Sequence, residues 1–195
     1  METKKSKKPL KIGKAAARLF NKSGYIETNM DHIAAASKMS KGGVYHYFSS
    51  KDEILHFILS NYMDLILDHL ESELDEFKDG PSKIKYLISR HIDLYTGNLA
   101  EAKTLLHEAH CLPAKYYKTI ATKERKYYRI VAEVIKGFLG DRAVDEAQIT
   151  SLTFLLFGMC NWIYSWYDPK GSVPPEELSE MILTVFLNGV NNYRP

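Results

Sequence analysis

The chain has 195 residues, of which 45% are hydrophobic and 26% charged, a composition typical of a folded soluble protein with a sizeable core. Its two cysteines, Cys111 and Cys160, lie far apart and show neither secretory nor metal-binding spacing, which favours reduced thiols in a cytoplasmic protein. The basic N-terminus has no apolar segment behind it, so we do not expect a signal peptide.

The net charge of +2 conceals an uneven distribution along the chain. Residues 1–52 contain 11 Lys and Arg against 4 Asp and Glu, which leaves residues 53–195 with 15 basic and 20 acidic residues. A basic head on an acidic body indicates that one end of the molecule meets a polyanion. The alternative is a solvated basic tail, since several of these lysines lie within the first eleven residues.

Helical periodicity begins in the basic head. One helix face is formed by Ile12, Ala15, Ala16, Leu19 and Phe20. Gly24 is expected to end this helix. Thr28 or Asn29 can cap a second helix that runs to about Lys38, and Asp31 completes a capping-box pattern with Thr28.

The rest of the chain also has the period of helices. Ser40 is a good N-cap for a short third helix, Lys41 to Phe48. The breakers Gly and Pro then predict helices over 52–77, 82–96, 99–111, 113–139, 145–167 and 175–193. We find no pattern that predicts a strand, so the expected fold class is all-α with about nine helices.

One apolar run, residues 152–167, needs a separate interpretation. It is about 16 residues long, short of the roughly 20 that a bilayer span requires, and Asn161 and Ser165 interrupt it. We therefore expect a buried core or interface helix and no membrane association.

Residues 29–48 carry the strongest functional signal, a helix, a tight turn and a second short helix. The second helix opens with Ser-Lys-Gly-Gly, where free backbone N–H groups can face phosphate and small residues let a backbone approach. Tyr45, His46 and Tyr47 offer polar tips that can reach phosphates or base edges. This arrangement is typical of a helix-turn-helix that reads DNA.

At this point the sequence closely resembles the TetR family of transcriptional regulators. The shared pattern runs without gaps from the Ala-rich first helix through Gly24-Tyr25, Thr28 and Ile33-Ala34 to Ser40-Lys41-Gly42-Gly43-Val44-Tyr45-His46-Tyr47-Phe48-Ser49-Ser50-Lys51-Asp52-Glu53-Ile54-Leu55. The resemblance implies a basic arm and DNA-binding domain over 1–51 and a ligand-binding and dimerisation domain over 52–195. It also implies a homodimer on a palindromic operator in double-stranded DNA, usually a repressor that a small ligand releases.

By position, the resemblance points to residues for DNA contact: Thr28, Asn29, Lys41, Gly42, Gly43, Tyr45, His46, Tyr47 and Lys51. Position 43 often carries Thr, Ser or Ala in this family, so glycine removes one potential side-chain contact here. Val44 and Phe48 are expected in the core of the head, and Lys51 and Tyr47 on phosphate. Lys4, Lys5, Lys7 and Lys8 are expected to add salt-sensitive affinity as a disordered arm.

The last two long helices are expected to form the dimer interface, because their apolar faces are too rich for one chain. These faces consist of Leu152, Leu155, Leu156, Met159, Ile163, Met181, Val185, Phe186 and Val190. The alternative is that they fill the core of one protomer, and both interpretations can hold on different faces.

Residues 161–171, 175–178 and 110–113 are similar to the branch of the family that responds to fatty acids and acyl-coenzyme A. This similarity predicts a small apolar effector in the helical body. Candidate pocket residues are polar or aromatic groups on mostly apolar helix faces: His91, Tyr95, His107, His110, Tyr117, Phe154, Phe157 and Trp162. For each of them, ordinary core packing is the competing interpretation.

Two alternatives to a ligand-responsive repressor remain at this stage. One is a helical adaptor without DNA binding. The intact set of candidate DNA contacts argues against it: Lys41, Tyr45, His46, Tyr47 and Lys51. The other is a metal-binding helical protein, because His107 and His110 have i, i+3 spacing and a third ligand could complete a Zn²⁺ or Ni²⁺ site. No nucleophile elbow, phosphate loop or carboxylate pair stands out, so we expect neither an enzyme nor a cofactor.

Overall fold

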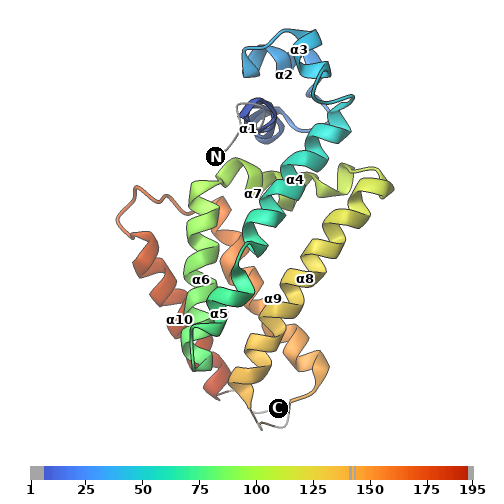
Figure 1. Cartoon of the computed structure of the whole chain (residues 1–195). Coiled ribbons are helices and arrows are strands. Elements are labelled where there is room, and N and C mark those ends of the chain that lie inside the picture. Colours follow the sequence, from blue (N-terminus) through green and yellow to red (C-terminus); the bar gives the residue numbers. More distant parts are fainter. Residues whose placement is uncertain (1–6, 141, 143, 193–195) are drawn as a thin grey trace. The chain divides into compact units, whose positions relative to one another are not determined.

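A computed structural model describes residues 7–140, 142 and 144–192, and these residues form ten α-helices, two short 3₁₀ segments and no strand (Figure 1). The expected all-α class is therefore confirmed. The described part has one helix more than the nine or so expected, because the predicted helix 52–77 is two helices.

The chain divides into two compact units. The first, here called the head unit, consists of residues 1–65 and 98–123, and the second, the body unit, of residues 66–97 and 124–195. The boundary expected between residues 51 and 52 concerns functional domains and stays a prediction.

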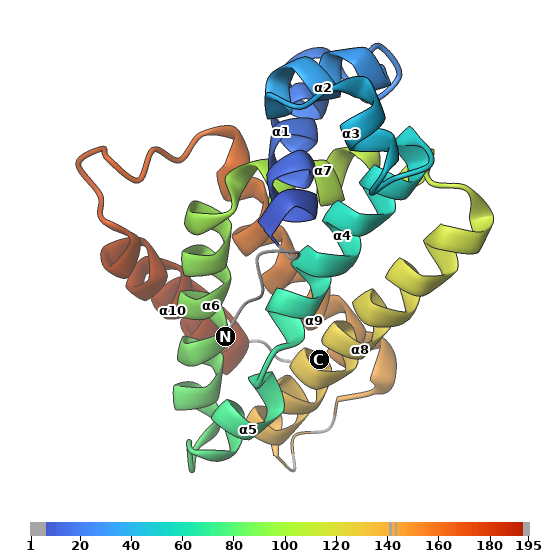
Figure 2. The same ribbon diagram turned by 45° about the horizontal axis from the view of Figure 1, so that its top comes forward.

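The head unit is built around α1, which packs against α2 and α7. Its elements are α1 (Lys7–Ser23), α2 (Met30–Ser37), α3 (Lys41–Tyr45), the larger part of α4 (Lys51–Leu67), α7 (Leu99–Glu108), a 3₁₀ turn (Ala109–Cys111) and the beginning of α8 (Ala114–Leu139). Figure 2 shows α2 above α1, with α3 beside both helices. Burial of Ile12, Phe20, Ile33 and Val44 joins these helices into one core, because each side chain is almost completely removed from water.

The body unit centres on α6, which packs most extensively on α10. Its elements are the end of α4, α5 (Leu70–Asp75), α6 (Gly80–Gly97), the remainder of α8, α9 (Glu146–Asn161), a 3₁₀ turn (Trp162–Ser165) and α10 (Pro175–Asn192). Ile88, Ile92, Leu156 and Phe186 are among its buried side chains.

The single helix predicted over 52–77 was wrong. His69 adopts a left-handed backbone conformation with φ 53°, so α4 ends at Leu67 and α5 begins at Leu70. The side chain of Arg90 holds this break by donating to the carbonyl of Asp68 and, at 2.7 Å, to the carboxylate of Glu73. The local residue pattern does not predict this break, because Arg90, which stabilises it, lies in α6.

Several other predicted helix ends shift. The predicted third helix ends at Tyr45 rather than Phe48, although the N–H groups of Tyr47 and Phe48 still donate to Val44. The apolar run 152–167 divides between α9 and the following 3₁₀ turn. No helix in the described ranges combines the length and apolarity needed to cross a membrane.

Candidate nucleic-acid interface

Side-chain caps fix the geometry of the helix-turn-helix. The Asn29 side chain accepts from the N–H of His32 at 2.9 Å, and the Asn29 N–H donates to Nδ1 of His32 at 3.4 Å. The capping box is therefore formed by Asn29 and His32, and the expected Thr28–Asp31 box was wrong. Lys38 ends α2 in a left-handed conformation with φ 54°, and Ser40 then caps α3 by accepting from Gly43 N–H at 3.1 Å.

Thr28 lies inside the head unit rather than on its surface. Its side chain is 2% exposed, and its hydroxyl donates to the Gly24 carbonyl at 2.8 Å. The hydroxyl therefore orders the loop between α1 and α2, and a DNA contact through Thr28 remains a prediction. Asn29, the next residue, is exposed.

The short α3 presents a polar face and buries an apolar one. Lys41, Gly42, Tyr45 and His46 are exposed, and Tyr47 is half-buried with its ring at the edge of His46. Burial of Val44 and Phe48 confirms their predicted place in the core. The polar face is therefore free to approach a second molecule without disturbing the packing.

Two contacts shape the start of α3. The ammonium of Lys41 lies 3.0 Å from the Asp31 carboxylate, and this ion pair raises the pKa of Lys41. A Cβ on Gly43 would lie 3.1 Å from the Ser40 hydroxyl oxygen, so glycine leaves room for the cap. Because Gly43 has no side chain, the Ser40 cap of α3 is undisturbed.

Lys51 connects the start of α4 to the loop before α2. Its ammonium donates to the carbonyls of Tyr25 at 2.7 Å and Ile26 at 3.2 Å, and lies 4.2 Å from the centre of the Tyr25 ring. The Tyr25 hydroxyl in turn donates to Asp52, and burial together with this bond raises the pKa of Tyr25. Because an ammonium has three donors, one N–H of Lys51 is left for a phosphate.

Two of the four lysines expected in a disordered arm belong to a helix. Lys7 and Lys8 begin α1, so their assignment to a disordered arm was wrong. Lys4 and Lys5 lie outside the described residues.

Two of the predicted effector-binding residues meet at a small cavity in the body unit. His91 and Phe157 line a space of about 10 Å³ together with Leu87, Ile88, Tyr127, Val131, Leu156 and Cys160. Nδ1 of His91 lies 3.3 Å from the Tyr127 hydroxyl, and the Tyr127 and Phe157 rings stack with centroids 5.4 Å apart. Burial lowers the pKa of His91 to about 4, against which a hydrogen bond to Asn161 acts. Sequence reasoning missed Tyr127, which shares α8 with many similar polar aromatics.

The other predicted effector residues are not gathered at this cavity. In the body unit, Tyr95 is buried, whereas Phe154 and Trp162 are 60% and 62% exposed. His107, His110 and Tyr117 belong to the head unit and are exposed. Within the described residues no three His, Cys, Asp or Glu side chains come close enough together to hold a metal ion.

The apolar faces of α9 and α10 divide between core and surface. Leu156, Ile163 and Phe186 are buried, whereas Leu155 and Val185 are 61% and 63% exposed. Between the two helices lies an apolar groove of about 470 Å³, whose lining includes Leu152, Leu155, Met159, Val185, Phe186 and Val190. The expectation of core packing thus holds for the buried residues, and a dimer interface through the exposed residues stays a prediction.

The depressed pKa of His91 gives a pH-dependent stability. Its pKa is about 4 in the folded protein and near 6.5 in the unfolded chain, so the unfolded state takes up the proton first. The free energy of unfolding should therefore fall as the pH falls from 6.5 toward 4, by about 2 kcal/mol between about pH 7 and pH 5. Urea unfolding at these two pH values should show that His91→Gln costs less stability at the lower one. His69→Gln, at an exposed histidine, is the control, and an equal cost of His91→Gln at both pH values would contradict this role.

Both parts of the chain match known families. Residues 12–58 match the model described as bacterial regulatory proteins, tetR family. Residues 78–190, more than half of the chain, match the model of the tetracyclin repressor-like C-terminal domain.

Individual relatives cover nearly the whole chain. The fatty acid metabolism regulator protein of Bacillus subtilis is 27% identical over 192 residues, which cover 96% of this chain and 99% of that protein. The crystal structure of a TetR-family transcriptional regulator from Bordetella parapertussis has a TM-score of 0.89 and 29% identity, covering 96% and 97% of the two chains. AibR, crystallised with isovaleryl coenzyme A and operator DNA, has a TM-score of 0.80 and 27% identity, covering 91% and 97%.

Proposed function

Because the chain belongs to the TetR family of bacterial regulatory proteins, we propose that it is a homodimeric repressor that a small apolar effector releases from a palindromic operator. It is a DNA-binding transcriptional regulator, and the capped helix-turn-helix with its exposed α3 face is the observation that carries this function. Families of this kind regulate transcription rather than catalyse reactions, and we propose that the chain works in the cytoplasm without catalysis of its own.

In the proposed complex, α3 enters the major groove with its exposed face toward the base edges. That face carries Lys41, Gly42, Tyr45 and His46. Asn29 at the start of α2, Tyr47 and the remaining N–H of Lys51 are placed on phosphates, which set the register of the head on the duplex.

The second copy occupies the groove between α9 and α10. The exposed Leu155, Met181 and Val185 would pack against the same surface of the partner, because a two-fold interface uses one patch twice. The resulting four-helix arrangement sets the distance between the two α3 helices, which must be about 34 Å, or a multiple of it, to reach successive major grooves.

The effector is proposed to be an acyl-coenzyme A or a fatty acid, with its apolar chain in the body unit. The relatives named for fatty acid metabolism and for isovaleryl coenzyme A support this class. The described cavity has room for about one water molecule, so a chain must part the stacked Tyr127 and Phe157 to enter. The cavity lining contains no Lys or Arg, and His91 is neutral. An uncharged cavity of this kind favours the apolar portion of the effector.

The test is a titration of the protein on a fluorescent operator duplex, which is first selected from a random-sequence library. Acyl-coenzyme A of increasing chain length should weaken operator binding by tenfold or more, which requires about 1.4 kcal/mol of preference for the released state. Free coenzyme A and planar hydrophobic compounds are the controls. If no acyl compound changes the affinity while the protein stays dimeric, the effector class is wrong. If no duplex can be selected from the library, the proposed repressor function itself is contradicted.

A further inference from the structure

A line of cations follows one face of α1 and has no part in the interface described above. Lys7, Lys11, Lys14, Arg18 and Lys22 recur every three or four residues and are all exposed. This spacing places them on one side of the helix, opposite the buried Ile12, Ala16 and Phe20. We call these five cations the α1 stripe.

The α1 stripe differs from an ordinary solvated helix face in its charge pattern. α1 carries no Asp or Glu, and none of the five cations makes an ion pair within the described part of the chain. The Cβ atoms of neighbouring stripe residues are about 5–6 Å apart, and the stripe is about 22 Å long at 1.5 Å of rise per residue. Mutual repulsion along such a line is relieved by an extended polyanion rather than by a single small anion.

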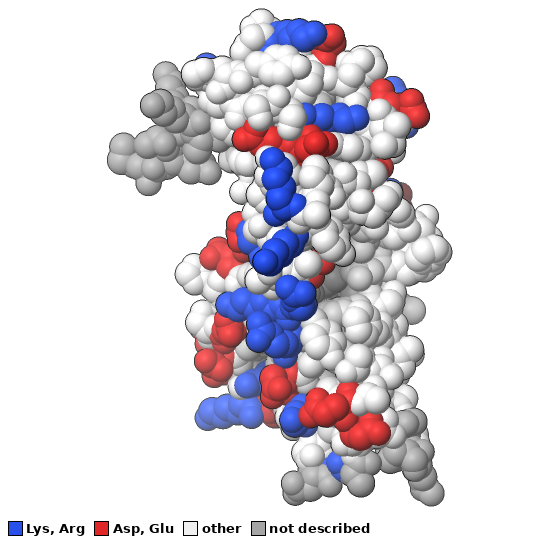
Figure 3. Space-filling view, turned by 90° about the vertical axis from the view of Figure 1, so that its right-hand side faces the viewer, with Lys and Arg blue, Asp and Glu red and all other residues white. Residues whose placement is uncertain are grey.

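The basic residues of α8 provide the contrast. There Lys123 pairs with Asp64 at 2.7 Å, Lys126 with Glu71 at 2.6 Å and Lys136 with Glu146 at 3.2 Å. Figure 3 shows Lys and Arg side chains over α8 with Asp and Glu beside them. These cations are partly neutralised by the protein itself, so α8 is the weaker candidate for a polyanion.

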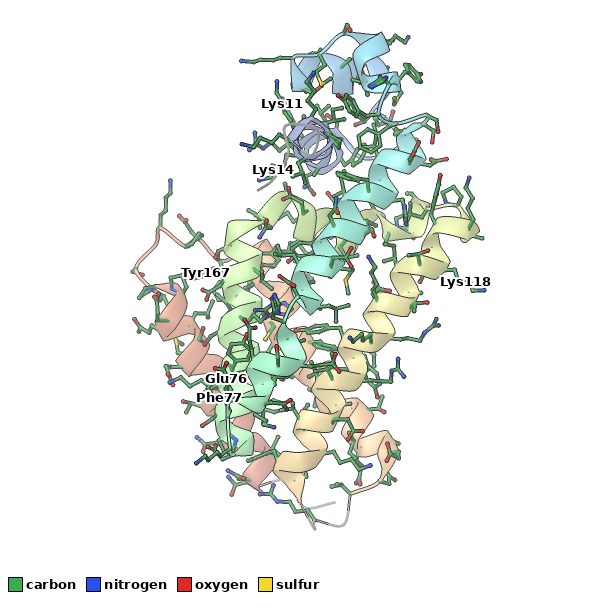
Figure 4. The ribbon with its side chains drawn as sticks, viewed as in Figure 1. Lys11, Lys14, Glu76, Phe77, Lys118 and Tyr167 are labelled. Atoms are coloured by element: carbon green, nitrogen blue, oxygen red, sulfur yellow. The ribbon has the colours of Figure 1, made fainter. Side chains whose placement is uncertain are left out.

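The position of the α1 stripe within the head unit identifies its partner. α1 packs directly against α2, the first helix of the helix-turn-helix, and Lys22 is in the last turn before the loop that leads to α2. Figure 4 shows Lys11 and Lys14 on the side of α1 away from α4. A duplex entered by α3 would continue past the head unit, and its phosphates would then come within reach of these long side chains.

We propose that the α1 stripe binds DNA phosphates that flank the base pairs read by α3. This proposal rests on the proposed DNA-binding function and extends the contact beyond the helix-turn-helix. Such contacts carry no sequence information, so they would raise affinity for operator and non-operator duplexes alike.

The test compares two operator duplexes, one limited to the half-sites and one extended by about 10 base pairs, one helical turn, on each side. The variant carries Lys11→Gln, Lys14→Gln and Arg18→Gln, which keep good helix formers at exposed positions. On the extended duplex its affinity should fall on the order of tenfold, and the slope of log affinity against log salt should flatten by roughly 0.9 for each phosphate that the variant no longer neutralises. On the short duplex the decrease in affinity should be clearly smaller.

The matched control carries Lys118→Gln, Arg129→Gln and Lys170→Gln, three exposed cations outside α1. It should bind both duplexes like the unsubstituted protein. Unchanged affinity of the α1 variant would show that the stripe is only solvated. Equal decreases in affinity on both duplexes would place its contacts inside the half-sites. An equal decrease in the affinity of the control variant would show that the effect comes from net charge alone. Each of these results overturns the proposal. If the unsubstituted protein binds no duplex at all, the proposed function fails and not this inference alone.

Discussion

Leu155→Arg should leave the protein folded but monomeric at micromolar concentration. Leu155 is 61% exposed on α9 and lines the groove between α9 and α10, so the protomer tolerates a larger polar side chain there. In the dimer the same position would bring an uncompensated charge into an apolar interface from both copies, which costs several kcal/mol. Light scattering should report the monomer mass, and circular dichroism should report unchanged helix content.

The loss of the dimer should also remove operator binding almost completely. Two linked heads bind their half-sites with an advantage of roughly 100-fold or more over single heads, and the monomer forfeits this advantage. Leu106→Arg, at a 41% exposed leucine on α7 of the head unit, is the matched control and should stay dimeric. A dimeric Leu155→Arg protein would refute the assignment of this groove to the second copy.

Lys51→Ala should weaken operator binding by tenfold to 100-fold, the range of about 1.5–3 kcal/mol for hydrogen bonds to a charged group. Two causes add up. The alanine variant loses the proposed phosphate contact, and it releases the carbonyls of Tyr25 and Ile26 that Lys51 holds next to Asn29. The measurement is fluorescence anisotropy over a range of salt concentrations, in which the slope should flatten by about one.

Tyr47→Phe provides the comparison for Lys51. It removes a single hydroxyl from a half-buried ring and should cost less affinity than Lys51→Ala. If Lys51→Ala leaves both the operator affinity and its salt dependence unchanged, Lys51 at the start of α4 does not contact a phosphate.

The sequence predicted most of the fold because its helices are amphipathic and carry clear breakers. Helix breaks that local residues determine, such as the turn around Ser40, were predicted at the correct place. The break at His69 was not, since its cause is Arg90, which lies in another helix and reaches Asp68 and Glu73 only in the folded body unit. Capping shows the same limit, because Thr28 and Asn29 are equally good caps until burial removes Thr28 from the choice.

The candidate site divides in the same way. Val44 and Phe48 were predicted correctly as core residues, because a short helix has few ways to pack. Tyr47, expected on phosphate, is half-buried, and its DNA contact stays a prediction. The effector residues were predicted from residue type alone, and type does not distinguish Phe157, which lines the cavity, from the 60% exposed Phe154 on the same helix. The role of Lys51 as a loop anchor was also hidden, since its partners are backbone carbonyls 25 and 26 residues away.

The division of labour within α3 has a consequence for how this protein can evolve. Val44 and Phe48 hold the helix in place from inside, whereas Lys41, Gly42, Tyr45 and His46 are outside and contribute little to packing. Surface positions of this kind tolerate replacement at small cost in stability. In the proposed docking, a gene duplicate could therefore acquire a new operator by changing these four residues, while the inherited core of the head unit remains as it was.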